Sequence, residues 1–302
     1  MPWSEDALHR WLARRAKPAQ LRGSAGHDAA VLAAGGTRIV QCADQTIEGV
    51  HVDLDVAPRA FGRKAANRAL SDLAATAATP RSLLLTIAAP RDKQDRWMRG
   101  LIEGVAQAAA AAGAELVGGD LASTSGPAVV SVFAHGELAG RRRPPGRDRA
   151  RAGQRVVLTG PVGGSRAGRH LRFEPRLVEG RSLFAAGATA LMDVSDGLAW
   201  DLWRLARASG VAIELDEVPI HRDARRAARD SGRSPLEHAL HDGEDHELIA
   251  CIGAGELPPG TTVLGRVRAG AGLWLGEQLA GELGSGGARE WLPSEGGFRH
   301  GE

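Results

Sequence analysis

The sequence predicts a two-domain α/β protein, and three observations support this prediction. The chain has 302 residues, which is enough for two domains of ordinary size. Each half alternates short apolar runs, typical of strands, with longer segments whose apolar residues recur at helical spacing. Between the halves, residues 139–153 are rich in Arg, Pro and Gly and show no apolar periodicity. We therefore expect an N-terminal domain over residues 1–140 and a C-terminal domain over residues 150–302.

In the first half, the expected strands and helices follow one another along the chain. Residues 37–43 form an expected strand that ends at Asp44. Pro58 begins a helix, because its missing N–H costs nothing in a first turn. Apolar residues then recur every four positions from Phe61 to Leu73, which predicts a buried helix face. The remaining elements expected here are strands at residues 82–88, 115–117 and 128–138 and a helix at residues 95–112 that ends at Gly113.

The second half begins with an expected strand at residues 155–159. A glycine-rich loop follows, from Gly160 to Gly168. A strand around Leu191 leads into an acidic segment and then a helix that ends at Gly210. Further along, we expect strands at residues 211–215 and 247–252, a polar loop at residues 241–245, and surface loops from residue 281 onward.

Composition and charge argue against several classes of protein. Apolar residues make up 43% of the chain and the formal net charge is +2, so neither disorder nor non-specific nucleic-acid binding is expected. No apolar run reaches 18 residues and no signal peptide is readable, which predicts a cytoplasmic protein without a membrane partner. Cys42 and Cys251 match no metal or redox spacing and fit a reducing compartment.

Acidic residues recur beside glycines, mostly where predicted strands end. Mg²⁺ prefers oxygen ligands, mainly carboxylates and phosphate oxygens. A single Asp-Gly pair is far more often a turn or a helix cap than a metal ligand. Several such positions in one chain nevertheless favour metal-dependent phosphate chemistry. These positions are Asp28, Asp44, Asp120, Asp193 with Asp196, and Glu244 with Asp245, together with Asp72 near the end of the first expected helix.

Other well-known motifs are absent from the sequence. There is no G-x-x-x-x-G-K-[ST] motif, and the loop from Gly160 to Gly168 contains no lysine, so a turn is its simpler interpretation. Neither a protein-kinase H-R-D set nor a G-x-S-x-G elbow is present. His238, His241 and His246 have no cysteine partners at zinc spacing, so structural roles are favoured for them.

Six ordered motifs give the chain a resemblance to a known family. With this support, the chain resembles the thiamine-monophosphate kinases, within the aminoimidazole-ribonucleotide synthetase superfamily, over nearly its whole length. The motifs are Gly26-His27-Asp28-Ala29-Ala30, Asp44-x-x-x-Glu48-Gly49-Val50-His51, Leu70-Ser71-Asp72-Leu73-Ala74-Ala75, Gly118-Gly119-Asp120, Met192-Asp193-Val194-Ser195-Asp196-Gly197-Leu198 and Gly243-Glu244-Asp245-His246-Glu247-Leu248.

The resemblance implies both a fold and an activity. The fold is an α/β (α+β), aminoimidazole-ribonucleotide-synthetase-like architecture, with an N-terminal α/β sandwich that forms a homodimer and a C-terminal α/β domain that completes the ATP and substrate cleft. The activity is transfer of the γ-phosphoryl group of ATP, the co-substrate, to thiamine monophosphate. Family members use several Mg²⁺ ions and form no phosphoenzyme, so no catalytic side-chain nucleophile is expected.

The resemblance also implies roles for individual residues. The implied Mg²⁺ ligands are Asp28, Asp44, Asp72, Asp120, Asp193 and Asp196. The implied ATP contacts are Gly119, Arg147 and Ser195, and the implied substrate contacts are His51, Glu244 and Phe298. Phosphoryl transfer gathers negative charge, which suits metal ions and arginine. A cationic thiazolium suits an aromatic ring.

Simpler structural roles stay open for some of these residues. Asp193 and Asp196 can cap the helix that follows them. Arg147 lies in an Arg-rich linker and can be solvated there, and Phe298 can anchor the C-terminal segment.

Some residues differ from the family pattern at the implied metal and substrate positions. His27 stands where the family has Asp, Cys42-Ala43 where it has Ser-Thr, and His246 where it has Tyr. Two further hypotheses therefore stay open. One is a sister enzyme that acts on another small phosphorylated metabolite. The other is a catalytically impaired protein that binds a nucleotide or a thiamine phosphate.

Overall fold

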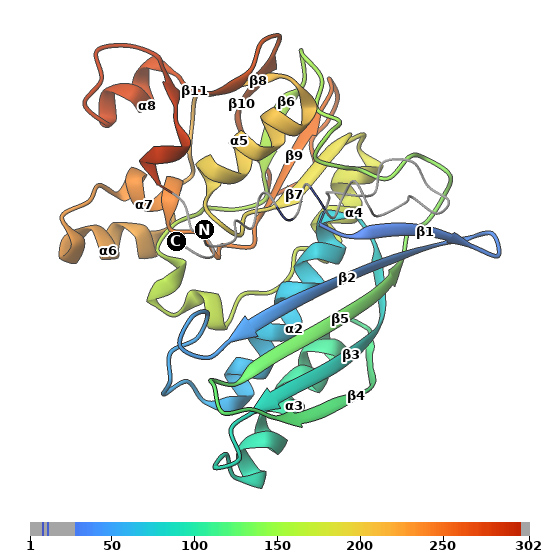
Figure 1. The fold of residues 1–302 in the computed structure, drawn as a ribbon. Helices are drawn as coiled ribbons and strands as arrows, with labels where there is room; N and C mark the ends of the chain where they lie inside the picture. The colour runs from blue at the N-terminus through green and yellow to red at the C-terminus, as the bar shows by residue number, and fades with distance from the viewer. Residues whose placement is uncertain (1–7, 9–10, 12–27, 297–302) are drawn as a thin grey trace.

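The computed structural model describes Leu8, Trp11 and residues 28–296, and these contain two β-sheets, one in each half of the chain (Figure 1). The first sheet has five strands in the order β1-β2-β5-β3-β4. The second has seven strands in the order β12-β11-β8-β10-β6-β9-β7. Helices pack against both sheets, which confirms the mixed α/β fold class.

The first sheet is covered on one face by two helices that pack closely together. Gly62 and Gly104 allow the close approach, because a Cβ on Gly62 would lie 2.0 Å from the Leu101 carbonyl oxygen. The predicted apolar stripe from Phe61 to Leu73 is buried. The elements of this half are β1 (Ala30–Ala34), β2 (Thr37–Ile47), α2 (Pro58–Ala75), β3 (Thr79–Ala89), α3 (Asp95–Ala111), β4 (Glu115–Ser123) and β5 (Val129–Glu137).

Two strands of the first sheet are longer than the sequence predicts. β2 continues past Asp44, because Gln45 and Ile47 still pair with β5. β4 continues through Asp120, because it stays parallel to β3 as far as Ser123. The expectation that Asp44 and Asp120 end their strands is therefore wrong, and both side chains project from within the sheet.

The second half contains several elements that the sequence analysis does not predict. These are α4 (Leu177–Ala185), α6 (Arg222–Ser231), α7 (Pro235–His241), β10 (Thr262–Arg268), β11 (Gly272–Leu275), α8 (Glu277–Glu282), β12 (Arg289–Trp291) and three short 3₁₀ turns at Ser165–Ala167, Arg169–Leu171 and Pro293–Glu295. The expected loop region after residue 281 includes β12, whose Trp291 is fully buried. The predicted elements are β6 (Arg155–Leu158), β7 (Ala190–Asp193), α5 (Leu198–Ser209), β8 (Ala212–Leu215) and β9 (Leu248–Ile252).

Helix α2 connects the two halves through a shared hydrophobic core. It contacts α4 and β7 of the second half as well as α3 and the first sheet. Leu70 and Leu73 of α2 belong to the same buried cluster as Leu191 and Leu248 of the second sheet. The polar residues of α2 that face the second half are thereby held at a fixed position.

The glycine-rich loop of the second half is a structural turn. The N–H groups of Gly163 and Gly164 donate hydrogen bonds to the carboxylates of Asp245 and Asp242, at 2.9 Å each. A Cβ on Gly163 would lie 2.6 Å from the Cα of Ala239, so the close packing requires glycine.

Among the described helices, none is long and apolar enough to cross a membrane.

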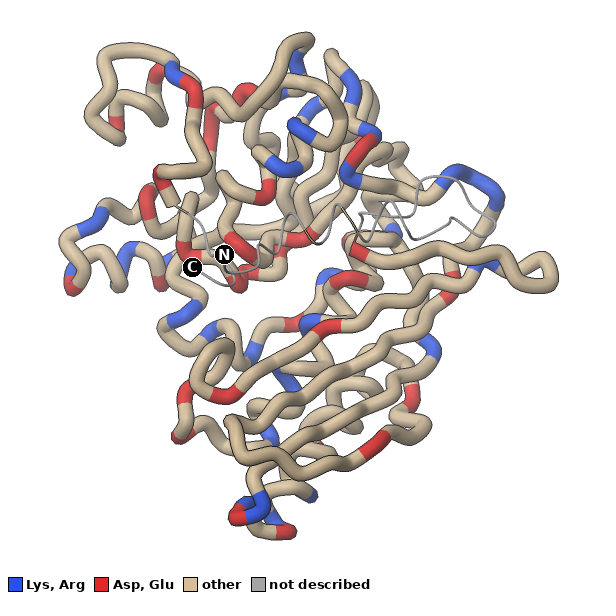
Figure 2. Tube along the Cα trace, viewed as in Figure 1, with Lys and Arg blue, Asp and Glu red and all other residues tan. Residues whose placement is uncertain are grey.

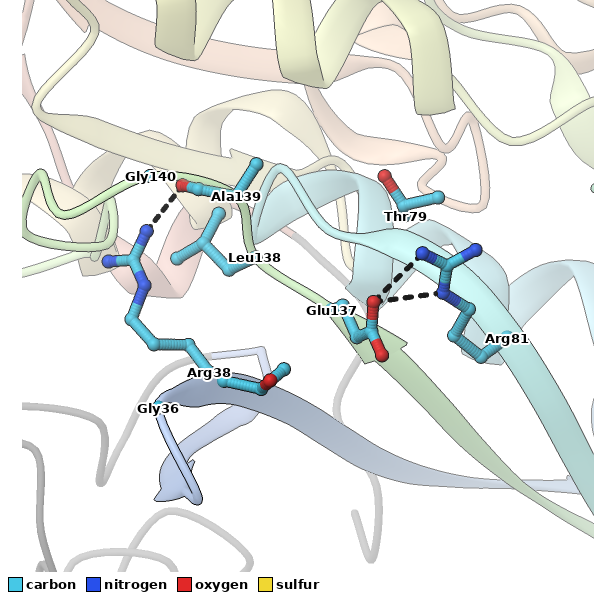
Figure 3. A pocket seen from close by; sticks show the side chains of 9 residues that line it. Gly36, Arg38, Thr79, Arg81, Glu137, Leu138, Ala139 and Gly140 are labelled. Atoms are coloured by element: carbon cyan, nitrogen blue, oxygen red, sulfur yellow. Dashed lines mark hydrogen bonds and ion pairs between the residues drawn. The ribbon is translucent and has the colours of Figure 1, made fainter.

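A pocket at the outer end of the first sheet is lined by Gly36, Thr37, Arg38, Thr79, Arg81, Glu137, Leu138, Ala139 and Gly140 (Figure 3). Its two arginines already have partners. Arg38 donates to the carbonyl oxygen of Ala139, and Arg81 pairs with Glu137 at 2.8 Å. None of the residues with an implied functional role lines this pocket, so the candidate site lies elsewhere.

Cys251 in β9 leads to a testable pH dependence. Burial raises the pKa of its thiol to about 12. An ordinary thiol pKa is about 8.5, so between these values only the unfolded chain loses the proton, and wild-type stability falls as pH rises. Cys251→Ala should remove this fall, which amounts to about 1.4 kcal/mol at pH 9.5. Urea unfolding of wild type and Cys251→Ala at pH 7 and pH 9.5 measures this fall. If the two proteins differ in free energy of unfolding by the same amount at both pH values, the raised pKa of Cys251 is contradicted.

Candidate functional site

Three carboxylates from separate parts of the chain meet where the two halves join. An oxygen from each of Asp28, Asp72 and Asp193 lies within 4.8 Å of the other two. Asp28 precedes β1, Asp72 is near the end of α2, and Asp193 is the last residue of β7. Figure 2 shows acidic and basic residues gathered at this junction. The structure therefore brings together three of the six aspartates that the resemblance implies as metal ligands.

Neighbouring side chains fix the orientation of two of these carboxylates. Asp193 accepts a hydrogen bond from the Ser71 hydroxyl at 2.6 Å, and its Oδ2 lies 3.0 Å from Nδ1 of His246. Asp28 binds the Arg147 guanidinium through both oxygens, at 2.5 and 3.3 Å. Arg147 thus contacts the acidic cluster directly.

The electrostatics of the cluster favour a bound cation. Burial raises the pKa of Asp72 well above its usual range, and the nearby charges of Asp193, Asp44 and Asp28 raise it further. Burial also acts on Asp193, but the hydrogen bond and charge of His246 hold its pKa below the ordinary value. An array of three carboxylates offers the hard oxygen donors that Mg²⁺ binds. The residues present therefore fit this ion.

Asp44 lies beside the cluster on β2 and is paired with an arginine. Its Oδ2 is 3.0 Å from Nε of Arg68. Cys42 projects from the same face of β2, and its thiol donates to the carbonyl oxygen of Ala69 at 3.1 Å. Burial, followed by the charges of Asp72 and Asp44, raises the pKa of Cys42 well above its usual value. A neutral thiol offers no hard oxygen, so Cys42 adds no Mg²⁺ ligand.

Helix α2 presents a column of charged residues to the second half of the chain. Lys64, Arg68 and Asp72 are spaced four residues apart and therefore share one helix face. Neither Lys64 nor Arg68 belongs to a sequence motif with an implied role. Their four-residue spacing to Asp72, beside the apolar stripe of the same helix, is the signal that could have identified them.

Lys64 is fully buried and joins α2 to the loop before β9. Its Nζ lies 2.7 Å from the Glu244 carboxylate, 2.6 Å from Nδ1 of His170 and 2.5 Å from the carbonyl oxygen of His51. Burial lowers the pKa of Lys64 to about 8, although Glu244 opposes the shift. Burial alone would raise the pKa of Glu244, but the His170 hydrogen bond and the Lys64 charge hold it below the ordinary range. The implied substrate residues Glu244 and His51 thus meet at one ammonium group.

The loop that carries Glu244 has an unusual backbone. Glu244 and His246 adopt φ values of +54° and +52°, which non-glycine residues rarely do. The Glu244 N–H donates to the Ser195 carbonyl at 2.7 Å, and the His246 N–H donates to the Val194 carbonyl at 2.9 Å. Such strain is retained where the surrounding structure fixes it, often at functional sites.

Asp196 and Ser195 lie at the start of α5, outside the three-carboxylate cluster. Asp196 forms an ion pair with Arg204. Asp201, which lies outside the sequence motifs, accepts hydrogen bonds from the N–H groups of Ser195 and Asp196 at 3.0 Å each. The N-cap residue of α5 is Gly197, and no side chain caps it. The alternative that Asp193 or Asp196 caps this helix is therefore wrong.

Gly119 and Asp120 lie apart from the cluster, on the edge strand β4. Asp120 is in register with Thr86, Ser131 and Gln45 on the three strands beyond it. Three strand spacings place Asp120 about 14 Å from Gln45, the neighbour of Asp44. Within one chain, Asp120 is therefore not part of the acidic cluster. Phe298 lies outside the described residues.

Comparisons with known proteins agree with this architecture. Residues 26–138 match the family model described as AIR synthase related protein, N-terminal domain. The thiamine-monophosphate kinase of Rhodopirellula baltica is 38% identical over 270 residues, covering 82% of this chain and 84% of that protein. The thiamine-monophosphate kinase of Mycobacterium tuberculosis is 36% identical over 299 residues, covering 92% and 89% respectively.

A solved structure extends the similarity to nearly the whole chain. It is described as AaThiL complexed with AMPPCP and TMP, has a TM-score of 0.86 and is 28% identical, and the match covers 98% of this chain and 97% of that one. The identities to the two curated relatives and the share of each chain covered are sufficient to assign the family. This chain belongs to the thiamine-monophosphate kinase family.

Proposed function

We propose that this chain transfers the γ-phosphoryl group of ATP to thiamine monophosphate, giving thiamine diphosphate and ADP. The observation that carries the proposal is the cluster of Asp28, Asp72 and Asp193, set beside Glu244 in a chain of this family. The cluster would supply the metal site that phosphoryl transfer requires, and the implied substrate contact Glu244 is held by Lys64, which lies on the same face of α2 as Asp72.

The chemistry follows from the charges of the two substrates. An oxygen of the monophosphate attacks the γ-phosphorus, a new O–P bond forms, and the bond from that phosphorus to the β–γ bridging oxygen breaks with its electron pair leaving on ADP. The acceptor is already anionic, so no side-chain nucleophile is needed. Mg²⁺, when bound, would neutralise the phosphate oxygens. Asp28, Asp72 and Asp193 would hold it, with Asp44 and Asp196 as further ligands.

Other residues would position the two substrates. We assign Arg147 and Ser195 to ATP, because Arg147 contacts the cluster through Asp28 and Ser195 precedes Asp196 at the start of α5. We assign His51, Glu244 and Phe298 to thiamine monophosphate. Lys64 keeps Glu244 ionised and in place, which suits recognition of a cationic substrate.

We also propose that the enzyme is a homodimer formed through the open face of the first sheet. Leu84 and Phe133 pair directly on this face and are 47% and 45% exposed. Asp120 lies in the neighbouring row of the same face and cannot reach the acidic cluster of its own chain. We therefore assign Gly119 and Asp120 to the site of the second copy.

Mixing two inactive variants tests this shared site. Asp72→Asn and Asp120→Asn should each abolish turnover alone. After equal amounts are unfolded and refolded together, the mixture should regain roughly a quarter of wild-type activity, because about half of the dimers are mixed and one of the two sites in each mixed dimer is native. An active monomer in sedimentation, or no recovery in a mixture shown to contain mixed dimers, would exclude the arrangement.

A catalytically impaired binding protein is the second candidate function. Cys42 favours it, because the family pattern has a hydroxyl residue there and the buried thiol cannot replace that ligand. Weaker metal binding is the expected consequence. An assay of thiamine diphosphate formation distinguishes the two candidates.

The test is formation of thiamine diphosphate from ATP, MgCl₂ and thiamine monophosphate, read by fluorescence after oxidation. Product should form, disappear with EDTA, and disappear in Asp44→Asn. Asp95→Asn is the control, because the Asp95 side chain is 77% exposed and lies on α3. A folded protein that binds AMPPCP but forms no product would favour the binding-only candidate.

A further inference from the structure

Arg68 occupies the middle position of the charged column on α2. Lys64, one turn earlier, binds Glu244. Asp72, one turn later, belongs to the three-carboxylate cluster. Because residues four apart share one helix face, Arg68 leaves α2 between the residue that binds the substrate contact and the residue of the metal site.

The hydrogen bonding of Arg68 is incomplete although its side chain is only 12% exposed. Its Nη1 donates to the Gln45 carbonyl oxygen at 2.9 Å. Its Nε is 3.0 Å from the Asp44 carboxylate but is not aligned for a hydrogen bond. None of the described residues accepts a hydrogen bond from Nη2. The buried Nε thus lacks an aligned acceptor among the described residues, and Nη2 is available to donate to a ligand.

The acidic groups that act on Arg68 come from four separate parts of the chain. Burial alone would lower its pKa, but Asp44 on β2, Glu244 in the loop before β9, Asp72 on α2 and Asp196 before α5 hold that pKa above its ordinary value. The guanidinium therefore stays charged, and the charges of both the substrate contact Glu244 and the metal-site residue Asp72 act on it.

Three nearby cations are already engaged. Lys64 contacts Glu244, His170 and the His51 carbonyl, Arg147 binds both oxygens of Asp28, and Arg204 pairs with Asp196. Arg68 is the remaining described cation on the α2 face between Glu244 and Asp72. Arginine also matches phosphate geometry, since its planar fork can donate two parallel hydrogen bonds.

We infer that Arg68 binds the phosphate group of the acceptor, and that it thereby selects thiamine monophosphate over unphosphorylated thiamine. The inference rests on the proposed function. The acceptor phosphate must contact the γ-phosphate of ATP, so it must lie between the thiamine contact at Glu244 and the metal site at Asp72. Arg68 spans that interval.

The test compares ligands that differ by one phosphate group. Calorimetry measures the binding of thiamine monophosphate, thiamine and AMPPCP, each with MgCl₂, to wild type, Arg68→Gln and Arg68→Lys. In Arg68→Gln, the Kd of thiamine monophosphate should rise by about 10- to 100-fold, as for loss of a charge-assisted hydrogen bond. The Kd values of thiamine and AMPPCP should stay within about twofold, and Arg68→Lys should recover part of the loss. In turnover, the KM for thiamine monophosphate should rise more than the KM for ATP.

Arg59→Gln is the matched control, because Arg59 lies on the same helix and pairs with Glu103 at the surface. Three results would overturn the inference: equal losses of thiamine and thiamine monophosphate binding, a loss confined to AMPPCP, or a wild type that does not distinguish the two thiamine ligands. Arg68→Lys keeps the test valid if Arg68→Gln does not fold. A wild type that prefers the monophosphate but makes no thiamine diphosphate would contradict the proposed function alone.

Discussion

Asp72→Asn is expected to abolish thiamine diphosphate formation and, in EDTA, to raise the temperature at which the protein unfolds. Asp72 is crowded by Asp28 and Asp193, and burial and these neighbouring charges raise its pKa well above the usual range. Asparagine keeps the shape of the side chain but removes one negative charge. The repulsion that destabilises the metal-free protein is thereby reduced, while the array of metal ligands loses a carboxylate.

Both effects should be large enough to measure. We expect turnover to fall at least about a thousandfold, the scale of losing one main electrostatic contact to the transition state. Relief of about 1 kcal/mol of repulsion corresponds to a rise in unfolding temperature of about 1.5–2 °C for a chain of 302 residues.

Thermal unfolding with EDTA and with MgCl₂ provides the measurement. Wild type should be stabilised by MgCl₂, and Asp72→Asn should be stabilised much less. Asp95→Asn on the exposed surface of α3 should behave as wild type in both conditions. If Asp72→Asn unfolds at a lower temperature in EDTA and keeps the full response to MgCl₂, then Asp72 is a structural residue.

Regular periodicity explains which parts of the fold the sequence predicts. The apolar stripe of α2 and the apolar runs of β3 and β5 are strong signals, and the structure confirms these elements. Helix α6 reads Arg-Asp-Ala-Arg-Arg-Ala-Ala-Arg-Asp-Ser and buries only Ala224, so it has no apolar stripe to detect. β12 is three residues long within a glycine-rich segment, and only packing around Trp291 distinguishes it from a loop.

The candidate site is predicted in part for a related reason. Motifs identify Asp28, Asp72 and Asp193, and the structure brings them together, but their roles as ligands stay predictions. A charged residue on a helix is normally predicted to be exposed to solvent, so Arg68 and Lys64 alone give no sequence signal of a role in the site. Their importance comes from tertiary packing of α2 against the second half, which buries that helix face. The separation of Asp120 from the cluster likewise follows from strand order, which no local pattern specifies.

Lys64→Met is expected to lower the free energy of unfolding by about 3–5 kcal/mol, the usual cost of removing one partner of a buried ion pair. Lys64 is fully buried, and the Glu244 side chain is 15% exposed. Methionine fills a similar volume but leaves the Glu244 carboxylate with His170 as its remaining partner in this network. The loss therefore arises from an uncompensated charge and not from a cavity.

Urea unfolding of single and double variants separates these causes. Lys64→Met combined with Glu244→Gln should recover most of the stability that Lys64→Met loses, because no unpaired carboxylate then remains. Lys93→Met is the matched control, since Lys93 is 23% exposed where it pairs with Glu48, and this change should cost less than half as much. Additive losses in the double variant would show that the two side chains do not stabilise each other.

The double variant also distinguishes stability from substrate binding. It should fold nearly as well as wild type, yet it lacks the carboxylate assigned to the cationic substrate and the ammonium that holds it. Its affinity for thiamine monophosphate should therefore stay low while its affinity for AMPPCP stays near wild type. This outcome would mean that the buried pair is retained for orienting the loop of Glu244, because a neutral pair of similar volume serves the fold equally well.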